Sequence, residues 1–270
     1  MSGPTATGAG EALSGSAAAT GAPAGSATSG KAAATGAPAG TGDSGPGAGR
    51  GSPRERLLEA ARDVMAAEGL EGLTLRAIAR RAGVSHGAPL RHFPTLASLL
   101  AAVAAEGFAR LVTTIDTHIA DAETRAGVAS SAAFGPRRRL AVAGQAYLRF
   151  ALDDPGVFSV TFRPERVDVN DPDYQTQGMR AFGQLVDLVS AAQADGWQAG
   201  ERPEVLAAVV WSHVHGMATL MIHGALPGVV GEADIDRLPA LSFLLVLGPD
   251  AVPDLAPAPG AGASPSDRPR

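Results

Sequence analysis

Apolar residues recur at helical spacing along most of the chain between residues 53 and 247. The first helix is predicted to begin at Ser52-Pro53-Arg54-Glu55, a capping box with proline at the first helical position. The residues expected on its buried face are Leu57, Leu58, Ala61, Val64 and Met65. Gly69 is expected to end this helix, because glycine readily adopts the left-handed conformation that closes a helix.

Two short helices joined by a glycine-containing turn are predicted next. Thr74 is expected to cap a helix that runs from about Leu75 to Ala82, and Gly83 to end it. Ser85 is then expected to cap a third helix at about 86–92. This is the pattern of a helix-turn-helix, whose second helix suits the width of the major groove of DNA. The turn alone fits an ordinary helical hairpin without a ligand equally well.

Helical patterning continues after Pro94. Thr95 is expected to cap a longer fourth helix, with Leu99, Val103 and Leu111 among its inner residues. Later helices are predicted at about 137–152, 156–162, 174–196, 203–226 and 235–247, with a loop at 166–174. No strand pattern competes over 53–120, so the sequence predicts an all-α protein of about nine helices.

Composition divides the chain into four parts. Residues 1–52 consist mainly of Ala, Gly, Ser, Thr and Pro, and ATGAPAG occurs in them twice. Such a segment lacks the apolar surface that offsets the entropy of ordering, and we expect it and residues 251–270 to be disordered. Between them we expect a helix-turn-helix domain at 53–100 and a helical regulatory and dimerisation domain at 101–250.

Charge is distributed unevenly over a chain whose formal net charge is −5. Residues 53–100 hold seven arginines and five acidic residues, whereas residues 101–270 hold 13 basic and 20 acidic residues. A mildly basic segment joined to an acidic one suits a polyanion-binding module on a body with another task. The chain has no cysteine, which excludes disulfides and thiolate zinc sites. No signal-peptide pattern is seen at the N-terminus, and we expect a cytoplasmic protein.

Residues 207–226 form an apolar run without Asp, Glu, Lys or Arg. The run is long enough to span a bilayer, but it contains three histidines and fits a buried or dimer-forming helix better. Two of these, His213 and His215, lie two residues apart and therefore point about 200° apart on a helix. They cannot be neighbouring ligands of one metal ion, so no metal site is expected.

The sequence from Arg56 to Leu100 resembles the DNA-binding domain of the TetR/AcrR family of bacterial one-component transcriptional regulators. The shared features are Ala60-Ala61, Gly69-Leu70, Thr74, Ile78-Ala79, Ala82-Gly83-Val84-Ser85, His92-Phe93 and Leu99. Residues 145–226 more loosely resemble the regulatory domain of one TetR-like branch that carries a Trp-x-x-x-His-Gly motif, here Trp211, His215 and Gly216.

This resemblance implies a homodimer that binds a palindromic operator and is released by a small-molecule effector, with repression as the family tendency. The DNA contacts that it implies are Thr74, Arg76, Ser85, His86, Gly87, Ala88, Leu90, Arg91 and His92. Phe93 is expected to pack inside. A dimer is needed because one short helix reads too few base pairs, and two half-sites are read together. The apolar helices at 203–226 and 235–247 are expected to pair with their copies as a four-helix bundle.

Two positions depart from the family pattern. The family usually has tyrosine where this chain has Leu90, and lysine where it has Leu96, and both usually contact the phosphate backbone. Phosphate contacts supply much of the affinity and the salt dependence, so weaker and less salt-sensitive DNA binding is expected. Arg50, Arg54 and Arg56 are candidates to compensate for the loss.

The regulatory domain is expected to hold its effector in a mostly apolar cavity. The candidates for contact are Tyr147, Phe150, Phe158, Phe162, Phe182, Trp211, His215 and Met217, although for any single one of them plain packing in the core is the more common explanation. No cofactor is expected. An enzyme is disfavoured because the glycine-rich GPGAGRG at 45–51 follows no strand and no nucleophile elbow is present. The main alternative is a helical ligand-binding dimer that has lost specific DNA binding.

Overall fold

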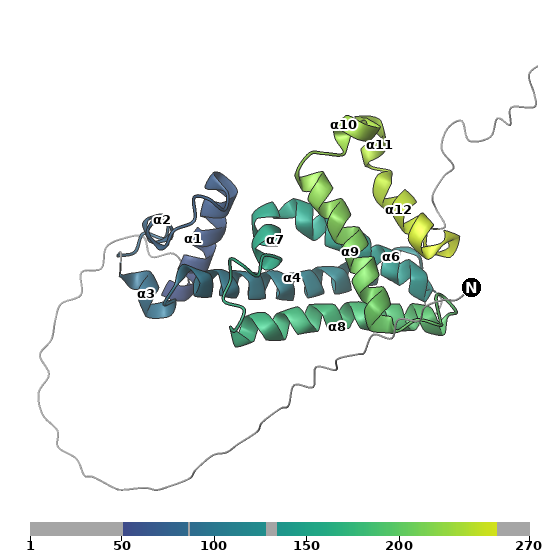
Figure 1. The fold of residues 1–270 in the computed structure, drawn as a ribbon, viewed down its shortest axis with the longest axis horizontal. Helices are drawn as coiled ribbons and strands as arrows, with labels where there is room; N and C mark the ends of the chain where they lie inside the picture. The colour runs from purple at the N-terminus through teal and green to yellow at the C-terminus, as the bar shows by residue number, and fades with distance from the viewer. Residues whose placement is uncertain (1–50, 86, 128–133, 253–270) are drawn as a thin grey trace, which may run out of the picture. The chain divides into compact units, whose positions relative to one another are not determined.

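The computed structural model describes residues 51–85, 87–127 and 134–252. In these ranges the protein is entirely helical, with eleven α-helices, one 3-10 helix and no strand, which confirms the predicted all-α class (Figure 1). The helices are α1 (Pro53–Glu68), α2 (Leu75–Arg81), α3 (Ala88–His92), α4 (Leu96–Arg125), α6 (Pro136–Asp153), α7 (Pro155–Thr161), α8 (Pro172–Ala194), α9 (Pro203–Ile222), α10 (Pro227–Val230), α11 (Glu232–Ile235), α12 (Leu238–Leu247) and the 3-10 helix η1 (Pro249–Ala251). The predictions for residues 1–50 and for the tail beyond 252 lie outside the described residues.

Helix α1 begins where the capping box predicts. The Ser52 hydroxyl accepts a hydrogen bond from the Glu55 amide at 3.2 Å, and the Ser52 amide donates to the Glu55 carboxylate at 2.8 Å. Helix α1 then buries Leu57, Leu58 and Val64 against α2 and α4. The short helices α2 and α3 therefore pack against α1, whose buried face is apolar.

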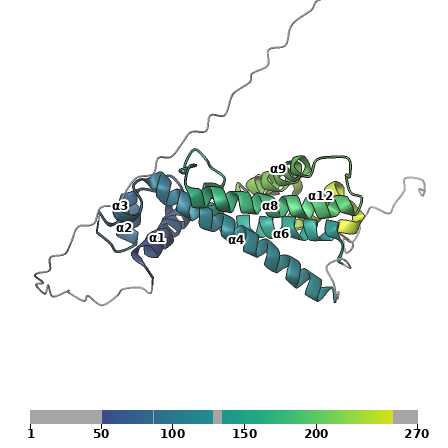
Figure 2. The same cartoon turned by 90° about the horizontal axis from the view of Figure 1, so that it is seen from below.

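Helix α4 is the element that both predicted domains share. It runs without a break across the predicted boundary between residues 100 and 101. Its residues from Leu99 to Ala105 are all buried, because α1 packs on one side and α6, α7 and α8 on the others. Figure 2 shows α4 diverging from α6 and α8 toward its C-terminal end, where most of its side chains are exposed.

Helix α7 lies very close to both α4 and α1. A methyl group at Gly107 of α4 would stand 2.5 Å from Thr161 Oγ1 and 3.0 Å from Val157 Cγ1 of α7. A methyl group at Gly156, in the first turn of α7, would stand 3.0 Å from Met65 Cβ of α1. The two glycines allow α7 to lie close to both α4 and α1, so that α7 connects the later helices with the helix-turn-helix.

Three helix boundaries in the C-terminal half of the chain differ from the predictions. Helix α9 ends at Ile222 rather than near residue 226, because Gly224 adopts a positive φ of 64° that stops the helix although the run remains uncharged. Helix α8 begins at Pro172, inside the predicted loop, because the Asp171 carboxylate caps it by accepting from the Tyr174 amide at 2.9 Å. The predicted helix at 235–247 begins only at Leu238 and is preceded by the short helices α10 and α11.

Among the helices of the described residues, α4 and α9 are long and apolar enough to cross a membrane by length and composition. The apolar stretch of α4 is 56% buried inside the protein, whereas that of α9 is only 17% buried. Helix α9 thus presents an uncharged face to its surroundings, a feature that the function must account for.

The close approach of α4 and α7 gives a first prediction. Gly107→Ala should lower the free energy of unfolding by about 1–3 kcal/mol, because the added methyl group forces the buried Thr161 and Val157 away from α4. Gly183→Ala on α8 is the matched control, because no atom lies within 4 Å of its added methyl group. The control should leave stability unchanged or raise it by up to about 1 kcal/mol through helix propensity. Equal effects in urea unfolding would contradict this assignment.

Candidate functional site

The predicted glycine turn joins α2 and α3. Gly83 adopts a positive φ of 65°, a conformation that glycine enters without a steric cost. The Val84 amide donates to the Ala79 carbonyl at 3.1 Å, which closes the turn over the end of α2. Thr74 caps α2 as predicted, because its hydroxyl accepts from the Ala77 amide at 3.0 Å.

The start of α3 corrects one prediction. The N-cap is Gly87 rather than Ser85, and no side chain caps this helix. Ser85 instead belongs to a turn before the helix, in which its carbonyl accepts from the Ala88 amide at 2.9 Å. Pro89 sits in the first helical turn, where its missing N–H has no intrahelical partner to lose, and its ring is fully buried. Pro89 therefore anchors the short helix in the core.

The residues that the family resemblance assigns to DNA lie at the surface of this helix-turn-helix. The exposed ones are Thr74, Arg76, Ser85, Gly87, Leu90, Arg91 and His92, while Ala88 is half-buried. His86 lies outside the described residues. Phe93 packs inside as expected, at 4% exposure, and the Arg54 guanidinium lies 5.4 Å from the centre of its ring. Contact of these residues with DNA stays a prediction.

The two leucines that depart from the family pattern occupy different environments. Leu90 is 58% exposed on α3, whereas Leu96 is half-buried and packs against the core. Leu96 therefore contributes to folding, which Leu90 does not. Among the nearby arginines, Arg81 is paired with Asp63 at 2.9 Å, while Arg76 is exposed at the start of α2.

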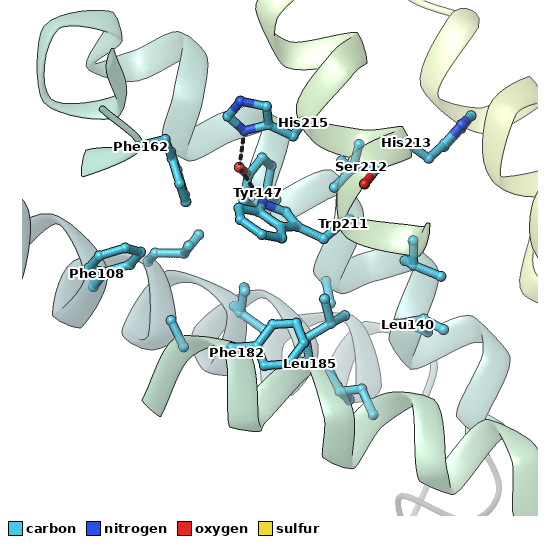
Figure 3. A pocket seen from close by; sticks show the side chains of 18 of the residues that line it. Phe108, Leu140, Tyr147, Phe162, Phe182, Leu185, Trp211, Ser212, His213 and His215 are labelled. Atoms are coloured by element: carbon cyan, nitrogen blue, oxygen red, sulfur yellow. Dashed lines mark hydrogen bonds between the residues drawn. The ribbon is translucent and has the colours of Figure 1, made fainter. Parts of the chain in front are cut away.

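A second site is a cavity of about 520 Å³ inside the C-terminal half, within the usual range for small-molecule pockets (Figure 3). Its wall is formed by residues of α4, α6, α8, α9 and α12, and by the end of α7. Most lining side chains are apolar or aromatic. The lining residues with a polar side-chain atom are Tyr147, Thr161, Tyr174, Trp211, Ser212, His213 and His215.

Three of these polar residues form one hydrogen-bonded cluster. Trp211 and His215 are four residues apart on α9 and therefore lie on the same face of that helix. The indole N–H of Trp211 donates to the Tyr147 hydroxyl at 3.2 Å, and the same hydroxyl lies 2.8 Å from His215 Nδ1 (Figure 3). The Trp-x-x-x-His spacing thus places two nitrogens on a single tyrosine of α6.

The eight predicted ligand residues divide into two groups. Five line the cavity, namely Tyr147, Phe162, Phe182, Trp211 and His215. The other three lie outside the lining. Phe158 stacks on the His215 ring with a centroid distance of 5.1 Å, Phe150 lies beneath the Arg110 guanidinium, and Met217 packs against the core. The aromatic or apolar character of a residue does not indicate whether its side of the helix faces the cavity or the filled core.

Several lining residues were not singled out from the sequence. Phe108 of α4 contacts the rings of Phe162 and Tyr174 at centroid distances of 5.5 and 5.7 Å, and Phe243 comes from α12. Phe108 had the helical spacing of an inner residue, but spacing does not distinguish a packed core from a cavity wall. Gly178 of α8 is a further indication that Phe108 faces α8. A methyl group added at Gly178 would lie 3.4 Å from the Phe108 ring.

The histidines of α9 diverge as their spacing requires. His213 Nε2 bonds with the Ser242 hydroxyl of α12, whereas His215 bonds with Tyr147 of α6. In the described part of the chain, no group of three His, Cys, Asp or Glu residues is arranged to hold a metal ion. Burial lowers the pKa of His215, and burial raises the pKa of Tyr147, although its bond with Trp211 acts in the opposite direction. Both side chains are therefore uncharged near neutral pH.

Known families and structures match both halves of the chain. The profile of the family described as bacterial regulatory proteins, tetR family, matches residues 57–103, and that of the tetracyclin repressor-like C-terminal domain matches residues 140–241. Among curated proteins, none matches the chain.

Solved structures share the fold over most of the chain. A protein of unknown function from Rhodococcus sp. RHA1 is 29% identical, with a TM-score of 0.59, covering 73% of this chain and 97% of its own. A putative tetR family transcription regulator from Shewanella sp. PV-4 is 19% identical, with a TM-score of 0.52 and coverages of 73% and 96%. The regulator FadR from Bacillus subtilis, in complex with stearoyl-CoA, is 15% identical, with a TM-score of 0.50 and coverages of 72% and 98%.

The environment of His215 predicts a pH dependence of stability. Because burial lowers its pKa in the folded state, the unfolded chain binds this proton more readily. The free energy of unfolding should therefore fall as pH drops below the unfolded pKa of about 6.5, and this contribution should be absent above about pH 7.5. His215→Gln should lose less stability than the wild type between pH 7.5 and 5.5 in urea titrations. Identical slopes for the wild type and His215→Gln would refute the assignment.

Proposed function

The chain belongs to the TetR family of bacterial regulatory proteins, and on this premise we propose that it is a homodimeric regulator that binds a palindromic operator and is released by a small molecule. The observation that carries the proposal is the continuity of α4. This helix begins beside the helix-turn-helix and lines the ligand cavity with Phe108, Leu111 and Ile115 further along. Repression is the mode we propose, with the cytoplasm as the compartment that holds the operator.

The exposed face of α2 and α3 supports the DNA-binding role. Arg76 projects from the first turn of α2, and Arg91 and His92 lie in the last turn of α3. Arginine reads guanine edges or phosphates, whereas Thr74, Ser85 and the backbone at Gly87 and Ala88 suit phosphate contacts and close approach. His86 and Leu90 complete the proposed set.

The outer face of α9 supports dimerisation. Val205, Val209 and Leu220 are 47%, 57% and 47% exposed, and Leu245 of α12 is 85% exposed. Ala208, Ser212 and Gly216 recur four residues apart on the same face, and their small side chains allow another helix to approach closely. A second copy of α9 and α12 would cover this uncharged face as a four-helix bundle. An exposed apolar face of this kind favours a dimer over a monomer.

Helix α7 supplies a route from the cavity to the DNA-binding helices. Phe162 follows its C-terminal end and lines the cavity, while Gly156 at its N-terminal end touches Met65 of α1. Arg110 of α4 pairs with Asp154, which caps α7, at 2.9 Å. An effector that displaces Phe162 would therefore shift α7 against α1 and change the separation of the two recognition helices.

One observation favours the alternative of a ligand-binding dimer without specific DNA binding. Leu90 is exposed where the family usually has a tyrosine that contacts phosphate, so one usual DNA contact is missing from each copy. Stearoyl-CoA bound to Bacillus subtilis FadR gives a precedent for ligand binding in this fold, and at 15% identity it informs the fold alone.

Selection of bound sequences from random DNA tests the proposed function directly. We expect a palindrome whose half-sites lie about one helical turn, or a multiple of it, apart. Arg76→Ala should weaken binding to the selected site about tenfold or more, because each of two copies loses a base or phosphate contact. Arg180→Ala replaces an exposed arginine of α8 and should leave the affinity unchanged. Failure to enrich any sequence would favour the alternative.

The dimer surface is tested by a charge placed on α9. Val209→Glu should shift the protein from dimer to monomer in sedimentation velocity and weaken operator binding, because a buried unpaired carboxylate opposes association. Val169→Glu, at another exposed valine, should leave the dimer intact. A Val209→Glu protein that sediments as a dimer would place the interface elsewhere.

A further inference from the structure

The ligand cavity offers no formal charge to its occupant. None of the described residues that line it is Asp, Glu, Lys or Arg. The lining also contains two histidines, of which His213 is exposed and bonded with Ser242, while the half-buried His215 packs its ring against Phe158, Phe162 and Trp211. This packing removes water from the His215 ring and lowers its pKa, which favours its neutral form. An ionised ligand group would enter this wall without a counter-charge, at a cost that binding would not recover. The lining therefore selects for an uncharged molecule.

The Tyr147 hydroxyl supplies the main polar anchor, and its hydrogen bonds can be assigned. Trp211 Nε1 can only donate, so the Tyr147 oxygen accepts from it. The hydroxyl proton then goes to His215 Nδ1, because the reverse tautomer would leave a buried O–H without a partner. This arrangement gives a chain from Trp211 through Tyr147 to His215 in which each group strengthens the next. One lone pair of the Tyr147 oxygen remains unused.

We propose that the effector is an uncharged, mainly apolar molecule with one N–H or O–H group, which donates to the free lone pair of Tyr147 in the cavity. The inference rests on the proposed regulatory function, because it names the class of molecule that this cavity senses. Phe108, Phe162, Phe182 and Leu185 surround the rest of the ligand, so its remaining surface is apolar or aromatic.

Three fluorescent probes of one skeleton test this class without knowledge of the natural effector. N-phenyl-1-naphthylamine is neutral and carries one N–H, its N-methyl derivative lacks that donor, and 8-anilinonaphthalene-1-sulfonate adds an anion. Titration of the full chain should show the neutral amine binding at least tenfold more tightly than the sulfonate. The N-methyl derivative should bind about fivefold more weakly than the amine, as expected for one hydrogen bond.

Variants at the anchor separate hydrogen bonding from shape. Tyr147→Phe should weaken the amine about fivefold and remove its advantage over the N-methyl derivative. If the advantage persists in Tyr147→Phe, the methyl group is rejected by shape and the donor assignment is wrong. Leu185→Arg places a cation in the wall and should reverse the preference between amine and sulfonate.

Variants on α8 show whether the probes occupy this cavity. Ala181→Trp fills the space beside Phe182 and should abolish binding of the amine, whereas Ala191→Trp on the exposed face of the same helix should not. Ala181→Leu is a smaller replacement, for use if the tryptophan prevents folding, and it should weaken the amine in proportion to the volume it fills. Retention of full amine binding in both Ala181 variants would overturn the site assignment.

Binding of the sulfonate gives the result that would contradict a neutral ligand. Arg163 is exposed and precedes the lining residue Pro164 in the sequence, so it is the cation to test as a partner for a bound anion. Sulfonate binding as tight as amine binding, lost in both Arg163→Ala and Ala181→Trp, would overturn the proposal of a neutral ligand. These titrations contain no DNA, so they report on the cavity even if sequence selection yields no operator and the proposed function fails.

Discussion

The close packing of α7 against α4 is the contact on which the arrangement of the two halves depends. Gly107 and Gly156 carry no side chain, and this absence allows α7 to touch α4 and α1 at the same time. Val157 and Thr161 are completely or almost completely buried in this contact, and the Thr161 hydroxyl is satisfied by the Val157 carbonyl at 2.8 Å. A looser contact would leave the helix-turn-helix attached mainly through α4, and movement of the cavity wall would not reach α1.

Local signals in the sequence predicted the helix-turn-helix well, because each acts over a few residues. The Ser52 and Thr74 caps and the Gly83 turn all lie where the sequence places them. The predicted Ser85 cap is wrong. Pro89 fits the first turn of a helix that begins at Ala88, so Ser85 falls in the turn before this helix. A cap pattern alone does not decide between two starting points only a few residues apart.

The sequence predicted a mostly apolar cavity, but it did not predict which residues line that cavity. An apolar, histidine-containing α9 and a tyrosine on α6 are visible in the sequence, whereas their meeting at one hydroxyl depends on how α6 and α9 cross. Phe158 and Phe162 are four residues apart at α7, yet one stacks behind His215 and the other lines the cavity. Periodicity identifies the side of a helix that is buried, but empty and filled space on that side look the same from the sequence.

Helix α9 carries the cavity wall on one face and the proposed dimer surface on another. Trp211 and His215 face the cavity, while Val209 and Gly216 face outward, where we propose that a second copy packs. Because a helix is rigid over this length, a ligand that moves Trp211 or His215 also moves the proposed interface. On the proposed function, an effector would change the half-site separation in two ways, by rotating the copies about α9 and by displacing α7 against α1.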